Sequence, residues 1–132
     1  TTNTHLMRKT LETVVRLFRS TAEQFAEHSG PVTKTAQKIA DQAASASRKG
    51  VYTDPDQYLS TVQDQLSLLV ELGEQLNGVA GEATIERYLE AVSGLQSALE
   101  TAQPAFEVAI ALDRVAEAAV DLEVLYSVIP DE

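Results

Sequence analysis

Apolar side chains recur at intervals of three and four residues along most of the chain, and this period constrains the fold more than any other feature of the sequence. Such spacing places apolar residues on one face of an α-helix. Breaks rich in Gly and Pro divide the pattern into five stretches. The expected helices cover residues 4–28, 31–48, 55–77, 82–102 and 104–129. No stretch of useful length alternates apolar and polar residues as a half-buried strand would.

The residues at the breaks predict how these helices begin and end. Gly30 suits a left-handed position after the first helix, and Pro31 suits the first turn of the second. Asp54 followed by Pro55 is typical of a helix N-cap. Pro104 predicts either a short turn or a kink in one long helix. Because these connections are short, neighbouring helices are expected to pack antiparallel.

The length and composition of the chain suit one helical domain. Its 132 residues are 44% hydrophobic and include no Trp, so a single modest core would consist mainly of Leu, Val, Ile and Ala. We therefore predict an all-α fold, a single antiparallel up-and-down bundle of four to five helices over residues 1–132. Since Thr1 is not a Met, we also expect residues upstream of this sequence.

The last predicted helix is apolar on two sides. Beyond its main face, Phe106, Ile110, Val124 and Val128 form a second stripe. A helix with two apolar faces is usually central in its fold, and a central position is the expectation here. The alternative is that the second stripe is an interface, although exposed apolar stripes are uncommon in monomers.

Opposite charges are concentrated in the two parts of the chain. Residues 1–50 carry eight basic and four acidic side chains, a net charge of +4, and residues 51–132 carry two basic and sixteen acidic side chains, a net charge of −14. An acidic surface repels nucleic acids and anionic membranes. We therefore expect no direct nucleic-acid binding. We also expect no membrane insertion, because charges interrupt the longest apolar-rich stretch, residues 105–129.

Two charged surfaces are candidates for binding. The basic residues of the first helix share one arc, but Glu12 and Glu23 lie within it at ion-pair spacing, which favours an ordinary solvated face. That basic arc comprises Arg8, Lys9, Arg16 and Arg19. The candidate acidic surface comprises Glu71, Glu74, Glu82, Glu86 and Glu90. These acids could attract a basic partner, but the favoured interpretation is solubility and balance against the basic first hairpin.

No group of residues predicts catalysis or a bound metal. The chain has no Cys, which excludes thiolate ligands and a Cys nucleophile and leaves the compartment open, with the cytoplasm favoured. His5 and His28 have no second His or carboxylate at ligand spacing. Glu123 is expected on the apolar arc of the last helix, where a buried carboxylate could mark a functional site, but no second carboxylate or nucleophile accompanies it. We predict no catalytic residue, no cofactor and no metal site.

Two glycines lie inside predicted helices and need an explanation. A Gly within a helix costs roughly 1 kcal/mol relative to Ala, so the close approach of a neighbouring element is expected to offset it. Gly73 lies on the core face of the third helix. Gly94 forms a strip of small residues with Ala91 and Ala98 that could admit a helix from another subunit.

The expected function is therefore a non-enzymatic protein–protein interaction or adaptor module that binds another protein or a second copy of itself. The candidate interface comprises Ala91, Gly94, Ala98, Phe106, Ile110, Val124 and Val128. The alternative is an acidic inhibitor or regulator of a basic protein, such as one that binds nucleic acid. A small-ligand carrier or an enzyme is less favoured, since only Glu123 and the tyrosines hint at a polar cavity.

Overall fold

Five α-helices and one short 3-10 helix make up most of residues 2–125, the part of the chain that this computed structural model describes. The elements are α1 (Thr2–Phe25), α2 (Gly30–Lys49), η1 (Val51–Thr53), α3 (Pro55–Gln75), α4 (Glu82–Glu100) and α5 (Ala105–Val120). No strand occurs within residues 2–125, where Ala80 and Val124 form an isolated antiparallel bridge. The predicted all-α helical bundle is confirmed.

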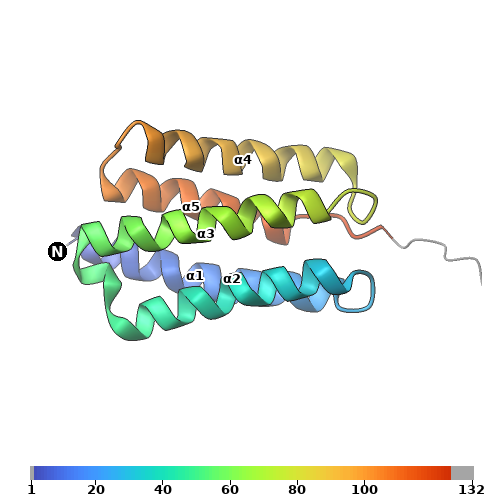
Figure 1. Cartoon of the computed structure of the whole chain (residues 1–132), viewed down its shortest axis with the longest axis horizontal. Coiled ribbons are helices and arrows are strands. Elements are labelled where there is room, and N and C mark those ends of the chain that lie inside the picture. The colour runs from blue at the N-terminus through green and yellow to red at the C-terminus, as the bar shows by residue number, and fades with distance from the viewer. Residues whose placement is uncertain (1, 126–132) are drawn as a thin grey trace, which may run out of the picture.

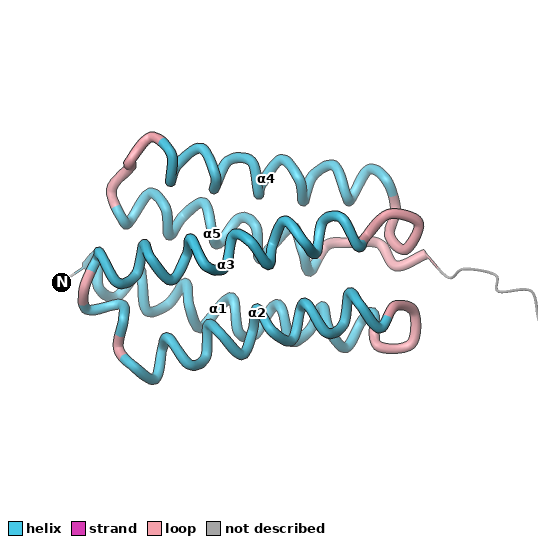
Figure 2. The backbone as a smooth tube through the Cα atoms, viewed as in Figure 1, coloured by secondary structure: helices cyan, strands magenta, loops and turns pink. Residues whose placement is uncertain are grey.

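The helices lie side by side along the long axis of the molecule, and consecutive helices run in alternate directions (Figures 1 and 2). Each helix contacts the next one along the chain, and α5 returns to contact α1, so the five helices close a ring. The expectation that the last helix is central is wrong. α5 forms one wall of this ring, and Ile110, Arg114 and Glu117 on its outer side are exposed to solvent.

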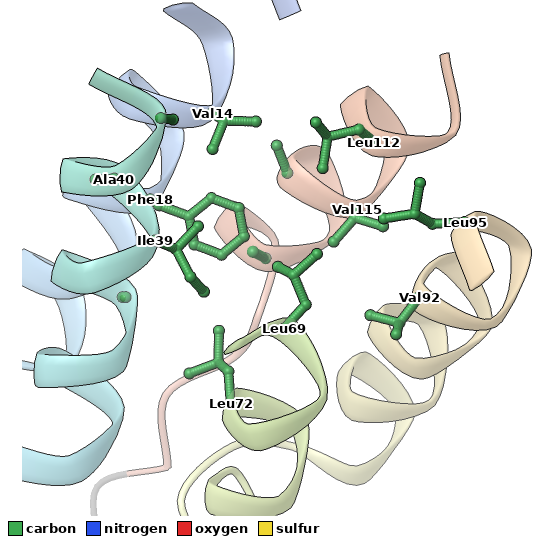
Figure 3. Close-up of a cluster of buried hydrophobic side chains, with 14 of the residues drawn as sticks. Val14, Phe18, Ile39, Ala40, Leu69, Leu72, Val92, Leu95, Leu112 and Val115 are labelled. Carbon is green, nitrogen blue, oxygen red and sulfur yellow. The ribbon is translucent and has the colours of Figure 1, made fainter. Parts of the chain in front are cut away.

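The core fills the inside of the ring with apolar side chains from every helix (Figure 3). Phe18 of α1, Ile39 of α2, Leu69 of α3, Leu95 of α4 and Leu112 of α5 are all completely buried. Each of them belongs to the apolar face that the helical period predicts. The burial of these faces, rather than the propensity of any single helix, holds the bundle together.

The helix ends follow the local chemistry of the chain. The Ser29 side chain caps α2 by accepting a hydrogen bond from the Val32 amide, and Asp54 caps α3 by accepting one from the Asp56 amide at 3.0 Å. Gly30 is the first residue of α2, so its predicted left-handed position is wrong. A left-handed glycine instead ends α2, where Gly50 has a φ of 73°.

The last helix is shorter than predicted, since α5 ends at Val120 rather than near residue 129. The chain then crosses the turn between α3 and α4, where the Gly81 amide donates to the Glu123 carbonyl at 2.8 Å and the Leu125 amide donates to the Val79 carbonyl at 2.9 Å. Leu122 is buried. These contacts replace the hydrogen bonds that further helix would supply. Val128 lies outside the described residues.

Candidate functional site

A groove runs between α4 and α5 on the outside of the bundle. It consists of two adjoining hollows of about 490 and about 430 Å³ that share Glu90, Ala91 and Arg114. Small side chains from both helices line it, namely Ala91, Gly94 and Ala98 of α4 and Ala111 and Ala118 of α5. Charged side chains flank them, namely Arg87, Glu90, Glu107, Arg114, Glu117 and Asp121.

The structure brings together part of the predicted interface. Ala91, Gly94, Ala98 and Ile110 line this groove, although two different helices supply them. Phe106 is half-buried and does not line it. Val124 lies in the extended segment beside Ala80 and not on a helix, because α5 ends before it. The second apolar stripe is therefore not one continuous surface.

On the α5 side of the groove, sequence reasoning found Ile110 but missed the other lining residues. Glu107, Ala111, Arg114 and Ala118 recur at intervals of four, three and four residues, which places them on one face of the helix. The signal is present in the sequence, but it is a face of small and charged residues rather than an apolar one. Only the position of α4 beside α5 shows that this face borders a groove.

The two glycines within helices have different surroundings. A Cβ atom at Gly73 would lie 2.8 Å from Leu89 Cδ2 and 3.5 Å from Tyr88 Cε2, so Gly73 admits side chains of α4 as predicted. A Cβ atom at Gly94 would have no neighbouring heavy atom within 4 Å. Packing within the chain therefore explains why a glycine stands at position 73. It does not explain the glycine at position 94.

The acidic surface of α3 and α4 is fully solvated. All five of its predicted residues are exposed, namely Glu71, Glu74, Glu82, Glu86 and Glu90. Val70 of α3 and Leu89 of α4, two large apolar residues, are also 41% and 45% exposed. Exposed apolar side chains among acids are typical of a surface that could contact a basic, partly apolar partner.

Within residues 2–125, the Lys and Arg side chains of the first hairpin form no ion pair with the other helices. Among residues 2–125, the one ion pair that a Lys or Arg forms joins Arg8 Nε to Glu12 Oε2 at 3.2 Å, within α1. Arg8 also lies over the Tyr52 ring, with Cζ 5.9 Å from its centroid. The Arg19–Glu23 pair that the spacing allowed is not formed. The sequence suggested that the acidic helices balance the charge of the basic hairpin. Within the described residues, no Lys or Arg of the hairpin does so through a direct ion pair.

Two buried polar side chains donate hydrogen bonds to backbone carbonyls of neighbouring helices. The Tyr88 hydroxyl donates to the Leu69 carbonyl at 2.7 Å, and the Gln65 amide donates to the Ile39 carbonyl at 3.4 Å. Burial raises the pKa of both Tyr88 and Tyr58 well above the ordinary tyrosine value, and for Tyr58 the charge of Asp113 adds to this effect. Both hydroxyls therefore stay protonated near neutral pH.

The remaining residues do not assemble a polar centre. The prediction that Glu123 lies on the apolar arc of a helix is wrong, because its side chain is exposed and its backbone binds Gly81 and Thr84. Within residues 2–125, no three His, Asp or Glu side chains gather closely enough to hold a metal ion. None of the described helices is long and apolar enough to cross a bilayer.

No protein-family model, no curated protein and no solved structure matches the chain.

Proposed function

We propose that this protein is a non-enzymatic interaction module whose α4–α5 groove receives a helix of another protein chain. The observation that carries the proposal is the open space above Gly94. A glycine destabilises a helix relative to alanine, and no other part of the chain packs closely against this one. Small residues allow two helices to approach closely. Ala91 and Ala98 continue the same small surface along α4.

The groove also has the length that a docked helix needs. Its α4 side extends from Arg87 to Ala98, about 17 Å at the rise of an α-helix. Charged residues flank the small ones, as in interfaces that combine a packed centre with a polar rim. These features support a directional contact with one helix more than a pocket for a small molecule.

Replacing Gly94 by alanine is expected to stabilise the free protein by about 0.5–1 kcal/mol, because the new methyl group restricts the unfolded chain and meets no atom in the folded one. Urea unfolding followed by circular dichroism measures the change. Gly73→Ala is the matched control, and it is expected to gain less, since Leu89 must move to admit the methyl group. A loss of stability in Gly94→Ala would contradict the open position of Gly94.

The groove can be tested by placing a photo-crosslinking benzophenone side chain at position 94 and irradiating the protein in lysate of its source. We expect a covalent adduct that maps to one helical segment of another chain. The same side chain at Ser67, exposed on α3, is expected to give no such adduct. Ala111→Trp, which fills the groove, is expected to abolish it. Equal labelling from both positions, or an adduct that survives Ala111→Trp, would overturn the proposal.

A second candidate function is an acidic regulator of a basic protein. The specific observation in its favour is that Glu71, Glu74 and Glu86 are exposed and form no ion pair within the described chain, beside exposed Val70 and Leu89. Substitutions distinguish the two candidates, because Glu74 and Glu86 belong to the acidic surface and do not line the groove. If charge reversal at Glu74 and Glu86 releases the partner and Ala111→Trp does not, the result would favour the acidic regulator.

A further inference from the structure

We infer that the helix received by the α4–α5 groove is α2 of a second copy of this chain, lying antiparallel to α5, so that copies associate head to tail. This inference rests on the proposed function, since it names the occupant of the same groove. It follows from the charges that the two surfaces carry.

The outer face of α2 carries a stripe of exposed charges opposite its buried face. Its members are Lys34, Lys38, Asp41 and Arg48, at intervals of four, three and seven residues. These intervals keep the four side chains on one side of a helix. Three of them are basic and one is acidic, so the stripe has a net charge of +2.

The α5 side of the groove carries the complementary pattern. Its charged residues, from Glu107 through Arg114 and Glu117 to Asp121, are exposed and follow at intervals of seven, three and four residues. Those are the α2 intervals read in the reverse direction. One antiparallel register therefore places every charge of one stripe beside an opposite charge of the other. The pairs are Arg48 with Glu107, Asp41 with Arg114, Lys38 with Glu117 and Lys34 with Asp121.

The dimensions of the two surfaces agree as well. Each stripe covers fifteen residues, from 34 to 48 and from 107 to 121, and its first and last residues are about 21 Å apart along a helix. The whole groove, with Arg87 and Glu90 of α4 included, has two basic and four acidic residues and a net charge of −2. The α2 stripe thus has the same length as the α5 stripe and a net charge opposite to that of the groove. The order of its charges is also complementary to that of the α5 stripe.

These pairs cannot form within one molecule. α2 packs against α1 and α3, whereas α5 packs mainly against α1 and α4, so the two stripes lie on different walls of the ring (Figure 1). None of the eight charged residues forms an ion pair within the described chain. Because the two surfaces are different, the contact leaves a free stripe and a free groove at the ends of each open assembly. Such a heterologous contact extends into open chains or closes into a ring, according to the rotation between copies.

The experiment uses two charge-reversed variants of the purified protein in sedimentation equilibrium. Variant one carries K34E, K38E and R48E, and variant two carries E107K, E117K and D121K. The unmodified protein is expected to form concentration-dependent oligomers at 0.15 M salt that dissociate towards 1 M salt, where the screening length falls from about 8 to about 3 Å. Each variant alone is expected to associate at least about tenfold more weakly, because like charges then face each other.

Mixing the two variants in equal amounts is expected to restore association, since the reversed stripe of one meets the reversed groove of the other and the native surfaces also match. The control is K9E/R16E/R19E on the exposed face of α1, which changes the net charge as much as variant one and is expected to associate like the unmodified protein. Circular dichroism checks that all variants keep their helix content.

Three results would overturn the inference. They are a purified protein that stays monomeric at all concentrations, variants that associate as well as the unmodified protein, and a mixture that associates no better than its components. If any of these occurs while the benzophenone side chain at position 94 still crosslinks to a helix of a different protein, the proposed function stands. The inference that a second copy occupies the groove is then wrong. If position 94 captures nothing either, both fail.

Discussion

Replacing Phe18 by alanine is expected to lower the free energy of unfolding by about 3–5 kcal/mol. Phe18 is completely buried in α1, and its ring lies among side chains from the other helices (Figure 3). Removal of the ring loses the favourable transfer of its surface out of water and leaves a cavity that five mutually braced helices cannot easily fill. The loss is a large share of the stability of a domain of this size.

Urea unfolding monitored by circular dichroism measures this effect. Phe106→Ala is the matched control, because Phe106 is only half-buried at the first turn of α5. We expect the control to lose clearly less stability than Phe18→Ala. Equal losses for the two variants would contradict the complete burial of Phe18 in the core.

Alkaline pH is expected to unfold the protein through its two buried tyrosines. Burial raises the pKa of Tyr58 and Tyr88 in the folded chain above the value of 10.0 that applies when they are exposed. The unfolded chain therefore releases protons above pH 10 that the folded chain retains. Stability is fully present below pH 10 and is lost above it, by about 1.4 kcal/mol per pH unit for each tyrosine.

Unfolding free energies measured from pH 8 to pH 12 test this expectation. The double variant Y58F/Y88F is expected to be less stable at pH 8, because the hydrogen bond from Tyr88 to the Leu69 carbonyl is lost. Its stability should fall much less steeply above pH 10. An unchanged slope would assign the alkaline transition to other groups. Tyr52→Phe, at a half-buried position, is the control variant and is measured over the same pH range.

The sequence predicts the helices and their inward faces because both depend on local spacing. Leu69, Leu95 and Leu112 are buried where the helical period places them. The end of α5 could not be predicted in the same way, since residues 121–125 have an apolar pattern that also suits a helix. Hydrogen bonds to the distant α3–α4 turn decide the conformation there.

The α4 side of the candidate site was predictable from the sequence, but on the α5 side only Ile110 was. The small residues around Gly94 stand out in the sequence, because a glycine in a helix needs a reason. Ala111 and Arg114 do not stand out, since their importance arises from the neighbouring helix. The complementary order of charges on α2 and α5 is visible in the sequence, but its meaning depends on which faces are exposed and which helices are already in contact.

The contact between α1 and α5 determines when the protein can finish folding as the ribosome makes it. The Gln24 side chain donates to the Leu122 carbonyl, 98 residues later in the chain. At usual rates of synthesis, about 5–20 s separate the emergence of these two residues. The hairpin of α1 and α2 can form early, but the side of α1 that α5 will cover stays open to solvent or to a chaperone during that interval.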